Sequence, residues 1–261
     1  MLLAVAGAAW WAGTALAGGA PTWSPESGLV FAVVDDGRSP TPRPAASIAA
    51  LGEPPTAGEG SGTHAFSLHQ DDGASPVTWD PCRPVQLVVN DRALPPGGHD
   101  LVPDAIAELA RATGLRVVLE GPTDEVPGLE DRASFQPDRY GDRWAPVLVA
   151  WSDPAEVALL AGGVAGMGGS TARATRDGVL AYVSGSVVLD GPQLQEIGRQ
   201  SGGYRRARAI VLHELAHVLG LGHVEDPTHL MHPASTSATS FHPGDLAGLA
   251  TLGRGPCISS L

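Results

Sequence analysis

The chain has 261 residues, of which 43% are hydrophobic, so it is long enough for one sizeable domain with extensions. The formal net charge is −12, and arginine is the only strongly basic residue because the sequence contains no lysine. No clustered basic patch is present, which argues against nucleic acid as a partner. The acidic composition suits a protein that remains soluble outside the cell.

The first twenty residues, Met1–Ala20, are apolar and carry no charge. The tripeptide Ala15-Leu16-Ala17 resembles a cleavage site, and we therefore predict that residues 1–17 are a signal peptide. No basic residue precedes the apolar run, however, and about 20 apolar residues can also span a bilayer, so an uncleaved membrane anchor is the alternative. Both interpretations place the rest of the chain outside the cytoplasm, either secreted or membrane-anchored and facing outwards.

Residues 18–76 are rich in proline, glycine and serine, and we interpret them as an N-terminal segment and linker. The apolar run at residues 28–34 is a candidate for a short strand within this segment. The folded domain is expected to span residues 77–261.

The expected domain alternates between strand and helix patterns. A helix that begins near Asp100 buries Ile106 and Leu109 on one face and ends at Gly114. Asp153 followed by proline marks the start of a second, short helix. We predict strands at residues 84–90, 115–120, 146–151 and 179–190, and longer helices at residues 100–113, 203–220 and 243–252.

Cys82 precedes the first predicted strand, and Cys257 follows the last predicted helix. An even number of cysteines in an oxidising compartment favours a disulfide, which would join the two ends of the domain. In the alternative, the Cys82 thiolate binds a metal, but its position immediately before a strand disfavours this role.

Residues 213–223 read His-Glu-Leu-Ala-His-Val-Leu-Gly-Leu-Gly-His. His213 and His217 are four residues apart, so their imidazoles lie on one face of a helix and can bind one ion. Glycine accepts a left-handed conformation and commonly ends helices, so Gly220 allows the chain to turn and His223 to supply a third ligand. Three protein ligands with a fourth position left for water are typical of catalytic zinc.

Glu214 lies beside this predicted zinc site but is offset from the ligands by one residue. The position suits a general base that takes a proton from a water on the metal. A buried helix with histidines satisfied inside the core would fit the same pattern. Five fixed positions, however, have chance odds on the order of one in ten thousand in a chain of this length, which favours the zinc site.

The pattern resembles the long zinc-binding motif of the metzincin zinc endopeptidases. Leu230-Met231-His232-Pro233 is similar to the turn of the matrixins, so the resemblance is closest to bacterial matrixin-like secreted proteases and assigns Met231 to a turn beneath the zinc. It implies an α+β, zincin-like fold with a twisted mixed sheet, three main helices and an edge strand along the cleft, near residues 168–175. Extended substrates would add to that edge.

The resemblance is incomplete at several positions. His232 stands where a tyrosine is common, and it is either a surface histidine or one that contacts water or substrate. No histidine lies between His99 and His213, so a second, structural zinc is not implied, and no cysteine-switch segment is present. Asp226 either caps a turn, which we favour, or orients a ligand histidine.

The sequence therefore predicts a secreted zinc endopeptidase that hydrolyses protein or peptide substrates, with one catalytic Zn²⁺ and Glu214 as the general base. The alternative is an inactive module that binds zinc or a partner on the same scaffold. An amidase-like hydrolase of cell-wall peptides would use the same chemistry. Acidic loops make Ca²⁺ a secondary candidate ion, although no D-x-[DN]-x-[DN]-G loop occurs.

Overall fold

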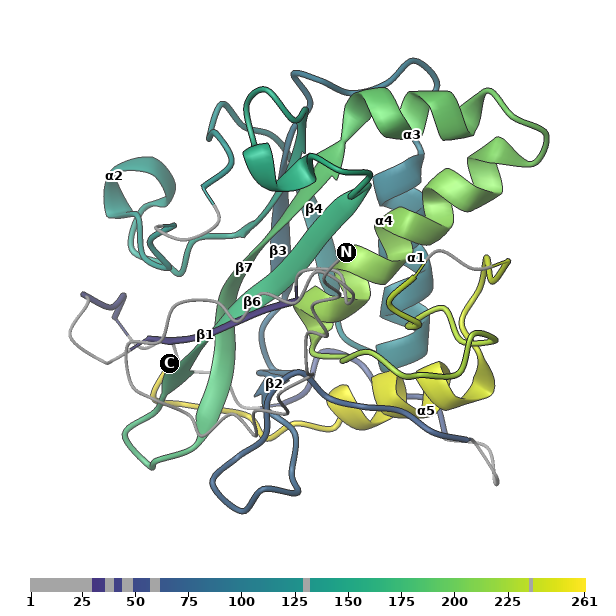
Figure 1. Cartoon of the computed structure of the whole chain (residues 1–261). Helices are drawn as coiled ribbons and strands as arrows, with labels where there is room; N and C mark the ends of the chain where they lie inside the picture. Colours follow the sequence, from purple (N-terminus) through teal and green to yellow (C-terminus); the bar gives the residue numbers. More distant parts are fainter. Residues whose placement is uncertain (1–29, 36–39, 44–48, 57–61, 129–131, 235–236) are drawn as a thin grey trace, which may run out of the picture.

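The computed structural model describes residues 30–35, 40–43, 49–56, 62–128, 132–234 and 237–261. In these ranges the chain forms a mixed α/β fold, in which α1, α3, α4 and α5 lie on one side of a sheet and the short α2 lies on the other (Figure 1). The predicted signal peptide or anchor, residues 1–17, lies outside the described residues. No helix among those described is long and apolar enough to cross a bilayer.

The sheet is mixed, as predicted. Its strands follow the order β1-β6-β7-β5-β3-β4, and β2 pairs separately with β7. The strands β7, β5, β3 and β4 are parallel, whereas β6 is antiparallel to β7. The strands are β1 Val30–Asp35, β2 Thr78–Trp79, β3 Val85–Asn90, β4 Val117–Pro122, β5 Val147–Ser152, β6 Gly166–Ala174 and β7 Leu180–Asp190.

The three predicted longer helices are confirmed within one residue at each end. The prediction of a helix starting at Asp153 is wrong. The Asp153 carboxylate accepts hydrogen bonds from the backbone N–H groups of Ala155 and Glu156, but the chain forms a turn and then a 3-10 helix at Ala158–Leu160. The five α-helices of the described residues are α1 Leu101–Thr113, α2 Pro137–Tyr140, α3 Gly191–Gly198, α4 Gly203–Leu219 and α5 Pro243–Leu252.

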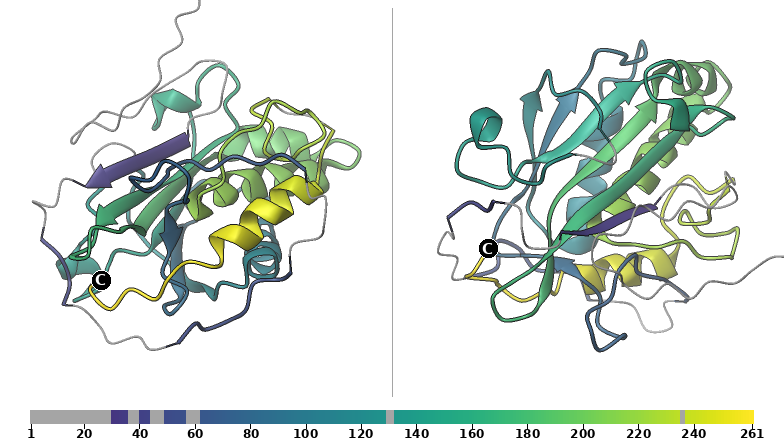
Figure 2. Two further views of the ribbon diagram at one scale, coloured as in Figure 1. Left: turned by 90° about the horizontal axis from the view of Figure 1, so that it is seen from below. Right: turned by 60° about the vertical axis from the view of Figure 1, so that its left-hand side comes forward.

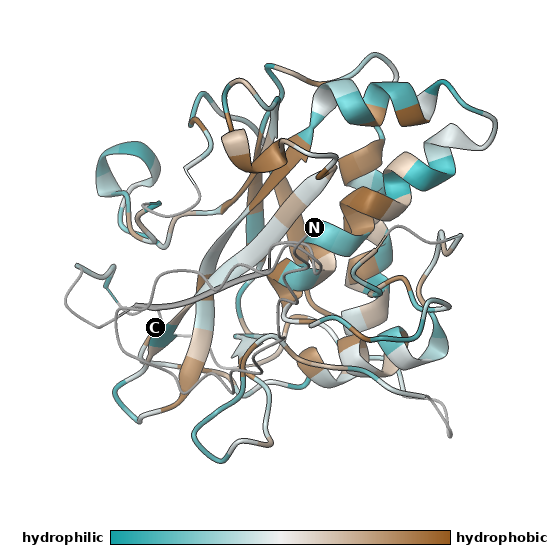
Figure 3. Ribbon diagram, viewed as in Figure 1, coloured by the Kyte–Doolittle hydropathy of each residue, from teal (hydrophilic) through white to brown (hydrophobic). Residues whose placement is uncertain are grey.

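The main core lies between the sheet and α1, α4 and α5. Hydrophobic residues colour parts of α1 and α4 next to the strands, whereas the outlying α2 is mostly hydrophilic (Figure 3). Leu212 and Leu215 of α4 are buried in this core together with Leu189 of β7. The indole nitrogen of Trp79 donates to the carbonyl of Val218 at 2.8 Å, which ties α4 to the second strand.

Strand β6 occupies the position predicted for the edge strand, but it is not the edge of the described sheet. Strand β1 pairs with it in parallel, from Val30 opposite Gly168 to Asp35 opposite Arg173 (Figure 2). The expectation of a free edge strand along the cleft is therefore wrong. The physical reason is that β1 supplies the backbone partners that an exposed edge lacks.

Part of the segment interpreted as a linker packs against the end of α4. The backbone N–H of Ser67 donates to the carbonyl of Gly220 at 2.9 Å, and that of Gly222 donates to Ala65 at 2.8 Å. Phe66 and Leu221 form an antiparallel bridge between these two bonds. Residues 65–67 thus hold the chain that leads from α4 to His223.

The predicted disulfide is present. It joins Cys82 to Cys257 across 175 residues, with their Cα atoms 5.4 Å apart. The Cys82 sulfur is bonded to its partner, so a Cys82 thiolate is not available as a metal ligand.

Candidate metal centre

The glycine that ends α4 is required for two separate reasons. Gly220 has φ +113°, which side chains rarely adopt, and its N–H donates to the carbonyls of Ala216 and His217. A Cβ at this position would also lie 2.9 Å from a ring carbon of Tyr182 and 3.0 Å from a methyl of Leu252. The turn after α4 therefore forms as the sequence predicts.

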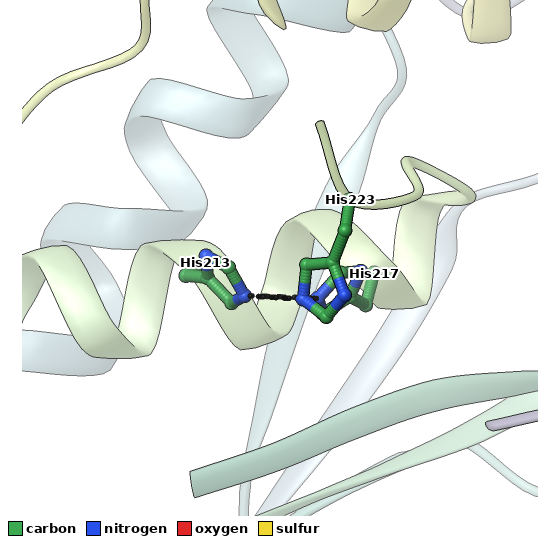
Figure 4. A group of neighbouring side chains, drawn as sticks. All are labelled: His213, His217 and His223. Carbon is green, nitrogen blue, oxygen red and sulfur yellow. Dashed lines mark hydrogen bonds between the residues drawn. The ribbon is translucent and has the colours of Figure 1, made fainter. Parts of the chain in front are cut away.

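The turn brings three histidine rings together, and all three come from α4 and the chain directly after it (Figure 4). The Nε2 atoms of His213 and His217 are 2.9 Å apart, those of His217 and His223 are 3.0 Å apart, and those of His213 and His223 are 3.2 Å apart. A tetrahedral ion with Zn–N bonds of about 2.0–2.1 Å would hold such atoms about 3.3 Å apart. The triangle therefore needs to open only slightly to hold an ion.

The other ring nitrogens show which way the lone pairs point. His213 Nδ1 donates to the carbonyl of Leu230 at 2.7 Å, and His217 Nδ1 donates to the carbonyl of Leu221 at 2.7 Å. A carbonyl can only accept, so in each neutral ring the proton is on Nδ1 and the lone pair is on Nε2. Two lone pairs thus face each other at 2.9 Å with no proton between them, an arrangement that a cation would stabilise.

The rings are kept neutral by their surroundings. Burial lowers the pKa of His213 and lowers that of His217 still further, with neighbouring imidazoles adding to the effect for His217. Burial and then the charges of His213 and His232 lower the pKa of His223 to about 3. Neutral imidazole is the form that binds metal, so the site is preset for a cation at neutral pH.

Glu214 is buried beside these ligands, with 8% of the residue exposed. Burial raises the pKa of its carboxyl to about 8. A buried carboxyl whose pKa lies near neutral pH can both accept and return a proton, which is the property required of a general acid and base.

Met231 lies in a turn, as predicted, and is buried with 1% exposure. Its carbonyl accepts from the N–H of Val224 at 3.1 Å, which ties the turn to the chain just after His223. The preceding carbonyl, that of Leu230, is the one that orients His213. The turn therefore supports the histidine cluster through backbone atoms.

Asp245 and His229 support this turn, and neither role was predicted. Asp245 Oδ2 accepts from the N–H groups of Leu230 at 3.0 Å and His242 at 2.9 Å, while its Oδ1 lies 2.8 Å from His229 Nδ1. His229 is 2% exposed and stacks on His242 with ring centroids 3.9 Å apart. The spacing of His242 and Asp245 as a capping box was the available sequence signal.

Two neighbouring polar residues are placed as follows. Asp226 caps a turn, as favoured, because its Oδ1 accepts from the N–H and hydroxyl of Thr228. His232 is half-buried, and its charge would act on both His213 and His223, so it lies close to the centre.

The described residues contain two groups of three potential metal ligands. One is the histidine triad, and the other is Asp80 with the two disulfide-bonded cysteines, which are not free to bind. Neither group consists of carboxylates, so the Ca²⁺ hypothesis gains no side-chain cluster in this part of the chain. The three imidazoles fit Zn²⁺, for which nitrogen ligands are preferred.

Comparison with known proteins gives one informative match. The family model for Matrixin matches residues 163–252, which include β6, β7, α4, the histidine cluster, Met231 and α5. This match supports a relationship to metzincin-type proteases over that segment. No curated protein matches the sequence.

A solved structure described as "GM1 bound form of the ECX AB5 holotoxin" is similar at 12% identity with a TM-score of 0.43. The match covers 74% of this chain and 89% of that chain. A TM-score this low does not establish a shared fold.

Proposed function

We propose that this protein is a zinc-dependent endopeptidase with a metzincin-type catalytic domain. The observation that carries the proposal is the pair of Nε2 lone pairs on His213 and His217, which converge with His223 on one point beside a buried carboxyl. The Matrixin match over the same residues supports this assignment.

His213, His217 and His223 would hold Zn²⁺, which would act as a Lewis acid and lower the pKa of a nearby water towards neutral pH. Glu214 takes a proton from the attacking water and passes it to the nitrogen of the departing amine. Leu230 and Leu221 keep two ligand rings in the tautomer that binds metal. Gly220 and Met231 hold the two turns that place the third ligand and support the first.

We also propose that the protein acts outside the cytoplasm, on protein or peptide substrates. The disulfide between Cys82 and Cys257 supports an oxidising compartment, and the apolar residues Met1–Ala20 support export, either as a cleaved signal peptide or as an anchor.

The test compares wild type with Glu214→Gln and with the control Glu225→Gln, which alters an exposed glutamate next to the site. Zinc content and casein cleavage are measured for each protein, with and without a chelator. We expect wild type and Glu225→Gln to cleave, and Glu214→Gln to bind zinc but to lose a factor of about 10²–10⁴ in rate. Wild type that binds zinc and cleaves neither casein nor a peptide library would instead establish a binding module.

A further inference from the structure

Strand β6 crosses α4 at the turn that carries Glu214, and the face of β6 towards the helix bears almost no side chains. Positions 166, 168 and 170 on this face are glycine, glycine and serine. Ser170 Oγ donates to the carbonyl of Val218 at 2.6 Å. Strand and helix therefore approach backbone to backbone, which is one of the situations that glycine inside a strand marks.

Gly168 sets the distance between the strand and the helix. A Cβ at this position would lie 2.3 Å from the carbonyl oxygen of Glu214 and 2.9 Å from its carbonyl carbon. These atoms belong to the helix backbone, so any side chain at position 168 would force α4 and β6 apart.

Gly166 has a different neighbour, the side chain of Glu214. A Cβ on Gly166 would lie 2.9 Å from Cγ and 3.4 Å from Cδ of Glu214, and 3.1 Å from a methyl of Leu189. The backbone of Gly166 is not left-handed, so alanine is compatible with its conformation. The limited space beside Glu214 and Leu189, and not the backbone conformation, is what requires glycine here.

Packing is what holds the Glu214 carboxyl in place. It is buried, and among the described residues no hydrogen bond to its oxygens is present, so no directional contact fixes its rotamer. The surfaces that confine it are therefore decisive, and the bare Cα of Gly166 forms one of them.

We propose that Gly166 is a positioning residue, whose missing Cβ provides the space in which the Glu214 side chain lies beside the histidine cluster. The inference rests on the proposed function for its catalytic consequence. A methyl group at position 166 would push Cγ and Cδ of Glu214 aside while leaving the three histidines in place. A displacement of about 1 Å in a reacting group can cost on the order of 100-fold in rate.

The first experiment is Gly166→Ala in the full chain, with Gly185→Ala as the matched control. Gly185 lies in β7 and is similarly crowded, since its Cβ would lie 2.7 Å from the carbonyl oxygen of Gly169 and 2.9 Å from Ser170 Oγ, but no atom of Glu214 is among these neighbours. We expect Gly166→Ala to lower kcat about 10- to 100-fold, with KM and zinc affinity close to wild type. Gly185→Ala should lower Tm and leave kcat of the folded enzyme unchanged. An unchanged kcat in Gly166→Ala, or a loss of zinc, overturns the proposal.

The second experiment is a double-mutant cycle on Tm, which does not depend on activity. Glu214→Ala removes Cγ and Cδ, so Gly166→Ala should lower Tm in the wild-type background and have little effect in the Glu214→Ala background. If Gly166→Ala lowers Tm equally in both backgrounds, the contact is with Leu189. That result overturns the proposal for Gly166 and leaves the proposed function of the protein untouched. If the wild type binds zinc but cleaves nothing, the proposed function is overturned, together with the expected loss of kcat in Gly166→Ala. The double-mutant cycle still tests whether Gly166 packs against Glu214.

Discussion

Two clusters of buried polar side chains in this protein satisfy their hydrogen-bonding groups in opposite ways. The first centres on Arg132 and Glu125, whose side chains are 6% and 9% exposed. Arg132 donates to both carboxylate oxygens of Glu125, to the hydroxyl of Ser184 and to the carbonyls of Pro146 and Gly185. The second is the histidine triad, where two ring nitrogens present lone pairs to each other.

The difference distinguishes a structural cluster from a candidate binding site. Burial alone would raise the pKa of Glu125, but Arg132 lowers it, and Tyr140 and Gln136 lower it further. Every charge in that cluster therefore has its partner inside the protein. In the triad, the Nε2 lone pairs of His213 and His217 face each other with no proton between them, an arrangement that a cation bound by the rings would stabilise.

The largest expected effect is the loss of that cation. His217→Ala should lower peptide hydrolysis by a factor on the order of 10³ or more, because the metal is no longer held. Zinc at about one hundred times its Kd should stabilise wild type by about 3 kcal/mol and the variant by almost nothing, as measured by thermal unfolding with and without zinc. His99→Ala, which alters an exposed histidine, is the control. Equal zinc stabilisation of His217→Ala and wild type would contradict the site.

Breaking the structural cluster should affect stability and leave zinc binding intact. Arg132→Met leaves the Glu125 carboxylate buried and unpaired, so the free energy of unfolding should fall by about 3–5 kcal/mol. Adding Glu125→Leu should restore most of it. Arg143→Met breaks the more exposed pair with Glu120, for which we expect less than about 1 kcal/mol. Similar losses for the two arginine variants, measured by urea denaturation, would remove the distinction between the buried and exposed pairs.

The pH dependence of stability in the metal-free protein should reveal that the groups of the candidate centre are buried without charged partners. Because burial raises the pKa of Glu214 to about 8, its contribution to stability is complete below its unfolded value near 4.5 and is lost as the pH rises through 8. Glu214→Gln cannot ionise, so it should be more stable than wild type at pH 9 by a few kcal/mol, with the difference vanishing near pH 4.5.

The histidines should act in the opposite direction in that experiment. Their pKa values lie below 6.5, so their contribution is present above pH 6.5 and is lost on acidification, in wild type and Glu214→Gln alike. Urea denaturation of chelator-treated protein between pH 4 and 9 measures both effects. A constant difference between wild type and Glu214→Gln would show that Glu214 is not held in a desolvated site.

A smaller effect is expected from freeing the outer side of β6. Successive N–H groups of a strand point to opposite sides, so one of residues 32 and 33 directs its N–H towards β6. The double substitution Ala32→Pro, Val33→Pro removes that N–H without the need to know which residue carries it. If β1 limits access of extended peptides, kcat/KM should rise about tenfold, equivalent to ~1.4 kcal/mol of docking free energy. Zinc affinity should not change. Unchanged or reduced cleavage would show that β1 does not compete with substrate.

Local patterns in the sequence predicted the parts of the site that depend on helix geometry. The four-residue spacing of His213 and His217 sets their distance whatever the rest of the chain does, and Gly220 ends the helix because of its own backbone freedom. The Cys82–Cys257 disulfide was also predicted, since two cysteines allow a single intramolecular pairing. Helix α3 was missed, although Asp190 accepts from the N–H of Gln193 as a cap.

Long-range contacts could not be predicted in this way. Arg132 and Glu125 are ordinary charged residues in sequence, and only the packing of the segment before β5 against β7 makes them a buried pair. The docking of β1 on β6 joins residues more than one hundred positions apart, and no periodicity within either strand specifies such a partner. Nothing near His229 in the sequence indicates its contact with Asp245, which lies 16 residues further along the chain.

The sequence alone predicts which groups meet at the candidate centre: three imidazoles on a helix and the turn after it, with a carboxyl one residue from the first. The tertiary structure decided which lone pairs face inward, how dry the carboxyl is and what confines it. Those properties depend on the carbonyls of Leu230 and Leu221 and on the bare face of β6, which the fold brings to α4 from distant segments. Spacing along a helix is fixed by local bonds, whereas burial, tautomer and free volume are set by neighbours that only folding supplies.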